Sequence, residues 1–199
     1  MRTARLSLLA VVVSTLVLTV GCAKTPAGQA SLTPPPPSGP VVVPGTVIDD
    51  GSEVELCLGA VAESAPPQCD GIPLAEWSWD GLDGATELSG ARWGAYAVHG
   101  TYDGRVVTVT EAPVPLALYD PAPIEDPTGG SPGSADEATL RDVEQRVHDT
   151  LGETVLASGA YDGRLWVTVV WDDGTLQRAA DAEFGDDVVV VQSAMREVG

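Results

Sequence analysis

The first 22 residues constrain the fold most, because their pattern indicates a leader segment that does not contribute to the folded domain. Two arginines precede a run from Leu6 to Val20 that is almost wholly apolar. A run of this length is too short to cross a bilayer as a helix, which needs about 20 residues, yet it suits the core of a secretory signal peptide. We therefore predict that residues 1–21 form a signal peptide and that the fold is built from the remainder.

The apolar run ends in LTVGC, which resembles the lipobox of bacterial lipoproteins. In that class the cysteine is lipidated on its sulfur and becomes the new N-terminus, so the resemblance implies lipidation of Cys22. Thr19 departs from the commoner leucine, and Leu18 lies one place earlier. The implied partner is the lipid bilayer, and the implied location is extracytoplasmic, with the chain anchored to the cell membrane. The alternative is an ordinary secretory signal followed by a chance cysteine.

The cysteine count agrees with this interpretation. The chain has three cysteines, and if lipid occupies Cys22, then Cys57 and Cys69 remain as one pair. We predict a disulfide between them, worth about 3 kcal/mol in the chain-entropy model. With only His99 and His148 as further soft ligands, far apart in the sequence, we expect no metal site.

The acidity of the chain limits its partners. The net charge is −19, and removal of the two leader arginines would widen the acidic excess to 21. Binding to nucleic acid depends on Lys and Arg that neutralise phosphates, so we expect no nucleic-acid partner. The surplus carboxylates are also explained by solubility alone.

Composition divides the remaining chain into four parts. Residues 22–44 contain four consecutive prolines and predict an extended linker that reaches up to roughly 60–70 Å. A first folded segment follows over 45–118, then a Pro/Gly-rich connector over 119–133, and a second folded segment over 134–199.

Short β-branched runs and Gly-rich turns fill the first folded segment. Residues 52–61 alternate between apolar and polar side chains, and residues 92–101 and VVTVTE favour further strands. This mostly β pattern predicts a small antiparallel barrel or sandwich, with the OB type as one form. The stretches CLGAVAESAPPQCDGIPLAEWSWDG and RWGAYAVHGTYDG also resemble a module of uncharacterised envelope lipoproteins of high-GC Gram-positive bacteria, a resemblance that implies no activity.

Four aromatic residues are candidates for a binding face. OB folds bind sugars and single strands through exposed aromatics, so Trp77, Trp79, Trp93 and Tyr102 could stack against a ligand. Trp77 and Trp79 lie two apart, which would place them on the same face of a strand. Because the chain has a single Phe, the alternative is that the tryptophans form the core itself.

The second folded segment predicts a compact α+β domain in the order α-β-β-α-β, with both helices over one sheet face. Residues 137–151 carry apolar side chains at helical spacing and end before Gly152, and Ser134 with Glu137 fits a capping box. Two strands, a short helix that ends at Gly185, and the buried strand VVVVQ follow.

The block Gly-x-Tyr-Asp-Gly-Arg occurs twice, at residues 100–105 and 159–164. Asp-Gly between β-rich runs is a strong hairpin signal, because both residues tolerate a positive φ. The flanking sequences differ, so we interpret the repeat as one kind of turn used twice rather than as a duplicated domain or ligand site.

Motifs for catalysis and for cofactors are missing from the sequence. We therefore expect no cofactor and predict a non-enzymatic surface lipoprotein that binds an envelope polysaccharide or protein. The alternative is an accessory or inhibitory module for an extracytoplasmic enzyme. A hydrolase that uses Glu76 or Asp80 beside the tryptophans is a third hypothesis.

Overall fold

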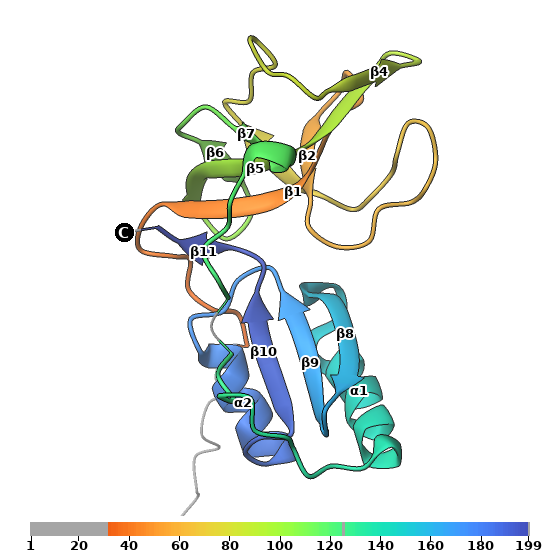
Figure 1. Cartoon of the computed structure of the whole chain (residues 1–199), viewed down its shortest axis with the longest axis vertical. Helices are drawn as coiled ribbons and strands as arrows, with labels where there is room; N and C mark the ends of the chain where they lie inside the picture. Colours follow the sequence, from red (N-terminus) through yellow and green to blue (C-terminus); the bar gives the residue numbers. More distant parts are fainter. Residues whose placement is uncertain (1–31, 125, 199) are drawn as a thin grey trace, which may run out of the picture. The chain divides into compact units, whose positions relative to one another are not determined.

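Residues 32–124 and 126–198, which the computed structural model describes, form two β-sheets and two α-helices (Figure 1). They belong to one compact unit. The predicted signal peptide, Cys22 and the first part of the linker lie outside the described residues. None of the helices in the described ranges is long and apolar enough to span a membrane.

Eight strands form the first sheet. They are β1 (Val41–Asp49), β2 (Val54–Cys57), β3 (Ile72–Ala75), β4 (Thr86–Leu88), β5 (Ala91–Tyr102), β6 (Val107–Val109), β7 (Val114–Pro115) and β11 (Arg196–Glu197). A short 3-10 turn (Leu116–Leu118) follows β7. β1 begins three residues before the predicted end of the linker.

Five of these strands close into a barrel. The order is β1-β2-β3-β6-β5, and β5 returns to pair with β1 along the whole of Val41–Asp49. β3 and β6 are parallel, whereas the other barrel pairs are antiparallel. When the β4 hairpin is set aside, this connectivity is that of the five-stranded OB barrel. The predicted barrel is thus confirmed, and the sandwich is excluded because the sheet closes on itself.

The barrel core follows from alternation along its long strands. β1 and β5 direct every second side chain inward, so Val43, Val47, Tyr96 and Val98 are fully buried. Met195, which comes from the opposite end of the sequence, is also fully buried in this cluster. It arrives there because β11 pairs with the start of β1.

The second sheet and its two helices follow one another in the predicted order α-β-β-α-β. The elements are α1 (Glu137–Leu151), a 3-10 turn (Gly152–Thr154), β8 (Val155–Tyr161), β9 (Arg164–Val169), α2 (Thr175–Phe184) and β10 (Val189–Ser193). β9 lies between β8 and β10, antiparallel to β8 and parallel to β10. The alternate β9 residues Leu165, Val167 and Val169 are fully buried against both helices, so both helices cover the same face.

The start of α1 corrects the predicted cap. The helix begins at Glu137 as expected, but its N-cap is Asp136, whose carboxylate accepts a 2.8 Å hydrogen bond from the amide of Thr139. Ser134 lies too far upstream to fill that role. Gly152 ends the helix with a φ of 51°, as the sequence predicts.

The repeated Asp-Gly block forms a hairpin turn at both places, but not the same turn. Between β8 and β9, Asp162 and Gly163 have φ angles of 49° and 75°, which is the two-residue type I′ arrangement. Between β5 and β6 the loop is longer, and only Gly104 has a positive φ there. The Asp103 carboxylate accepts bonds from two downstream amides instead. Both blocks thus form Asp-Gly hairpin turns, as predicted, but the two turns are not of one kind.

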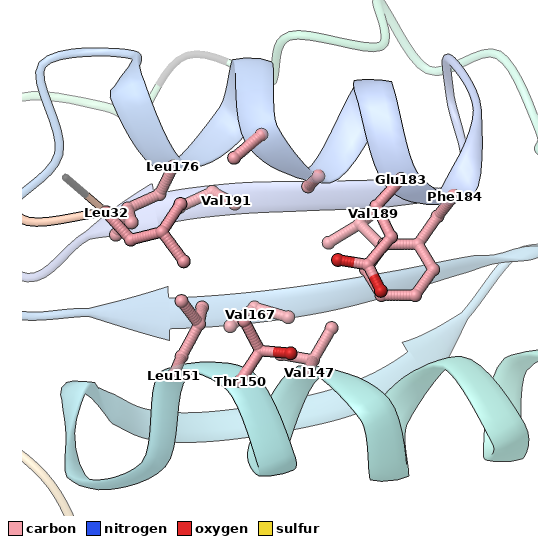
Figure 2. Close-up of a pocket in the computed structure, with 12 residues that line it drawn as sticks. Leu32, Val147, Thr150, Leu151, Val167, Leu176, Glu183, Phe184, Val189 and Val191 are labelled. Atoms are coloured by element: carbon pink, nitrogen blue, oxygen red, sulfur yellow. The ribbon is translucent and has the colours of Figure 1, made fainter. Parts of the chain in front are cut away.

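The end of the predicted linker is bound to the folded body as a strap, residues 32–40. The carbonyl of Pro35 accepts a 2.9 Å hydrogen bond from the indole of Trp171. The carboxylate of Glu197 accepts bonds from the amides of Ser38 and Gly39, at 2.8 and 3.1 Å. Leu32 lies between the two helices (Figure 2). This part of the proline-rich segment is consequently not a free tether.

The Glu197 contact makes the strap sensitive to acid. The amides of Gly39 and Ser38 hold the pKa of Glu197 below its ordinary value of 4.5. A carboxyl whose pKa is lower in the folded state stabilises that state above its unfolded pKa and loses the contribution as the pH falls through its folded value. We expect the amide proton shifts of Ser38 and Gly39 to titrate with a midpoint below 4.5. The same shifts should be independent of pH in Glu197→Gln.

Glu87→Gln, which alters an exposed carboxyl on β4, is the matched control and should leave the titration unchanged. A midpoint at or above 4.5, or a titration that persists in Glu197→Gln, would show that the carboxylate does not hold the strap.

The connector before α1 is likewise fixed to the second sheet. The amide of Gly133 donates a 2.8 Å bond to the carbonyl of Asp162, and the buried guanidinium of Arg164 donates to the carbonyl of Ser131. A Cβ on Gly133 would lie 2.2 Å from the carbonyl oxygen of Gly163, so a side chain has no room there.

Candidate binding cleft

A cleft of about 570 Å³ lies where β2 and β3 of the barrel meet the start of β8. Its barrel side includes Leu56, Leu58 and Ile72, and its opposite side includes Val155 and Leu156. This volume falls within the range of small-molecule and peptide sites. In OB folds, the surface of strands 2 and 3 is where ligands bind. The cleft therefore occupies the position where this barrel topology most often carries a site.

The rim of the cleft is acidic. Asp70 and Glu153 line it, both are exposed, and the lining residues within the described ranges include no Lys or Arg. On the neighbouring β2, burial and then the carboxylates of Glu53, Asp50 and Asp70 raise the pKa of Glu55. Burial is the main cause of this direction, and the smaller contribution of the three carboxylates reflects the negative charge gathered on this side of the barrel. The site suits a ligand that carries positive charge beside apolar groups.

The predicted disulfide shapes the barrel side of the cleft. Cys57 and Cys69 are bonded, with their Cα atoms 6.0 Å apart, and this confirms the predicted pair. Leu58 follows the first cysteine and Asp70 follows the second, and both line the cleft. The bridge thus fixes the separation of two segments that form one side of the site.

Trp77 and Trp79 lie together, although they belong to a loop and not to a strand as predicted. Their ring centroids are 5.0 Å apart in an edge-to-face arrangement, and both rings pack edge-to-face on Tyr96. The Trp79 indole donates a 2.8 Å bond to Asp49, and the guanidinium of Arg92 lies 4.7 Å from its ring centroid. Protein groups therefore already contact these two rings, which pack against the barrel core.

The other two aromatic candidates lie elsewhere on the barrel. Trp93 pairs in register with Ile48 of β1 and, at an odd position of β5, faces away from the side to which Tyr96 points. Tyr102 ends β5, about 20 Å along the strand from Tyr96 at the usual rise per residue. Burial, and then Asp103, raise the pKa of the Tyr102 hydroxyl. The four candidates do not share one surface, and a stacking role for any of them stays a prediction.

The two carboxylates of the hydrolase hypothesis do share a surface. Glu76 and Asp80 line a cleft of about 330 Å³ together with Glu111. Its remaining lining residues include the hydroxyls of Ser78 and Thr110 but no His, Cys or Lys. Among the described lining residues only the carboxylates could act as acid or base, so the hydrolase hypothesis depends on Glu76, Asp80 and Glu111 alone and stays a prediction.

A third cavity, of about 40 Å³, lies between α1 and α2 over the sheet (Figure 2). Leu32 of the strap lies beside Leu176 and Val191 at one end, and Phe184 lies at the other. The volume is close to that of a single water molecule, and the lining is almost wholly apolar. This space is a packing gap between the helices and is too small for a ligand.

One polar cluster was not predicted. The imidazole of His148 on α1 lies 2.9 Å from the hydroxyl of Ser158 on β8, which donates a 2.5 Å bond to Glu144. In a catalytic triad the acid orients the histidine, whereas here the acid contacts the serine. The cluster connects α1 to β8. The helical spacing of Glu144 and His148 was visible in the sequence, but their shared partner was not.

Comparisons with protein-family models, with curated proteins and with solved structures found no match. Within residues 32–124 and 126–198, no group of three or more His, Cys, Asp or Glu residues is placed to hold a metal ion. Function is therefore inferred below from the cleft and from the sequence.

Proposed function

We propose that this chain is a lipid-anchored, non-enzymatic binding protein of the cell envelope that captures a cationic, partly apolar envelope component. The observation that carries the proposal is the acidic cleft at β2 and β3, with its apolar sides and a volume of about 570 Å³. It combines the position, size and mixed lining expected of a recognition site.

The anchor is proposed from the lipobox resemblance at Cys22. Two acyl chains on one residue give stable attachment, whereas a single chain gives only marginal binding. Because the strap fixes residues 32–40 to the body, only residues 23–31 remain as a spacer. Fully extended, these nine residues span at most about 30 Å, so the cleft would stay near the membrane.

The anchor can be tested by expressing the full chain in a bacterial host that processes lipoproteins. We expect the native chain to enter the detergent phase on Triton X-114 separation and to gain the mass of a diacylglyceryl group after loss of residues 1–21. Cys22→Ala should enter the aqueous phase. A native chain that stays unmodified and aqueous would refute the anchor and leave the cleft untouched.

The cleft can be tested separately by site-specific crosslinking in intact cells. A photoreactive residue at position 153 should yield adducts with an envelope component, and Asp70→Lys in the same chain should reduce them at least fivefold by reversing charge in the cleft. The matched control places the photoreactive residue at position 87, on the exposed β4. Equal adducts from both positions, or no effect of Asp70→Lys, would overturn the role of the cleft.

A further inference from the structure

β8 is an edge strand whose outward main-chain groups have no partner within the described part of the chain. It is the outermost strand of the second sheet (Figure 1). The type I′ turn makes Tyr161 and Arg164 a pair that exchanges main-chain hydrogen bonds, and such pairs alternate with non-hydrogen-bonded pairs along an antiparallel ladder. Ala160 and Ser158 belong to the non-hydrogen-bonded pairs, so their N–H and C=O groups point away from β9. The amide of Leu165, opposite Ala160, indeed donates to Val188 on the far side of β9.

Among the residues that the structure describes, none bonds to these outward groups of Ser158 and Ala160. The other edge of the same sheet is treated differently. The side chain of Gln177 on α2 donates to the carbonyl of Val189 and accepts from the amide of Val191, at 2.9 and 2.8 Å. One edge is therefore capped by a side chain, while the other keeps its donors and acceptors available.

The charge pattern along β8 favours a particular partner. The strand VLASGAY contains no charged residue, although the chain as a whole carries a net charge of −19. Exposed edges in soluble proteins are usually protected by charge or proline, and β8 has neither. Carboxylates flank it instead, with Glu153 and Asp70 in the cleft beside its first residues and the exposed Asp162 after its last. A second copy of this chain would bring these acids together, whereas a basic partner would neutralise them.

We infer that an extended segment of a partner protein adds to β8 as a further strand, with uncharged residues paired to Ser158 and Ala160 and Lys or Arg residues in the acidic cleft. Main-chain bonds provide the affinity in this mode, and the charged end provides the specificity. The inference rests on the proposed function, since it names the partner class for the same cleft. Antiparallel pairing is the more stable form and puts the basic residues at the C-terminal end of the segment.

The probe is a synthetic peptide with three Thr-Val repeats followed by two lysines, titrated against the full chain by NMR. We expect binding with amide shifts at Ser158 and Ala160. Ala160→Pro removes the outward N–H without removing a bond to β9, and it should weaken binding at least tenfold. Ala160→Val, which keeps the N–H, is the matched control. Replacement of the two lysines by glutamates, or N-methylation of alternate peptide amides, should abolish binding.

Three results would overturn the inference. The first is that the peptide fails to bind, and the second is that it binds equally to Ala160→Pro and Ala160→Val. The third is that a second copy of the chain occupies this edge, which sedimentation would show as a dimer that Ala160→Pro dissociates. If position 153 still crosslinks an envelope component that depends on Asp70, the proposed function survives such a failure. If the peptide binds but crosslinking is independent of Asp70, the edge site stands and the envelope role of the cleft fails.

Discussion

Met195→Ala is expected to lower the free energy of unfolding by about 3 kcal/mol, although the residue lies only three places before Val198, the last described residue. Its side chain is fully buried in the barrel cluster beside Val41 and Tyr96. The amide of Met195 donates to the carbonyl of Val170 in the second half of the fold. A cavity at this position therefore affects the barrel and its junction with the second sheet together.

Urea unfolding, followed by both tryptophan fluorescence and far-UV circular dichroism, measures this effect. Met195→Leu conserves volume and should cost less than about 1.5 kcal/mol. Leu118→Ala removes a leucine that is 78% exposed and should change the stability by about 0.5 kcal/mol or less. If Met195→Ala were as mild as Leu118→Ala, Met195 would not be a core residue.

Patterns within a short window predicted the fold well. The α-β-β-α-β order of the second segment followed from helical spacing over 137–151, from Asp-Gly between two β-rich runs, and from glycines at 152 and 185. Each of these signals acts through the local backbone, so it can be read without tertiary contacts. The disulfide was equally accessible, because assigning Cys22 to lipid left Cys57 and Cys69 as the one remaining pair.

Contacts between distant segments could not be predicted. Nothing in the sequence around Met195 distinguishes a barrel residue from the tail of the second segment, and nothing in the prolines before Val41 marks Pro35 as the acceptor for Trp171. The two Asp-Gly turns differ for the same reason, since register and loop length decide the turn type.

The cleft was missed because its two sides are far apart in the chain. Leu58 and Ile72 come from the barrel, and Leu156 comes from the second sheet. Aromatic residues are more conspicuous in a sequence than such a combination, so they were the predicted site. In the structure Trp79 is held by Asp49 and Arg92 instead. The acidic bias that did signal this surface is spread over the whole chain and could not indicate one place.

Replacement of both Cys57 and Cys69 by alanine is expected to destabilise the barrel by about 3 kcal/mol. The bridge closes a loop with a sequence separation of 12, and opening it restores the conformational entropy of the unfolded chain. Cys57 is also almost fully buried, so part of the loss comes from the core. Urea unfolding should show a smaller decrease for the reduced native chain, which keeps the Cys57 sulfur in the core, than for the double variant. Glu63→Ala, at an exposed position of the same loop, is the matched control and should have little effect.

The same double variant should bind the peptide more weakly at the cleft even under conditions in which the barrel stays folded. Leu58 and Asp70 adjoin the two cysteines, so loss of the bridge frees both segments while the β1–β5 pairing still holds the barrel closed. We expect the lysine-ended peptide to lose most of its affinity in the absence of denaturant, while the Tyr96 environment keeps its native near-UV signal. Unchanged affinity would show that the cleft is held by the strands alone and that the bridge contributes only to stability.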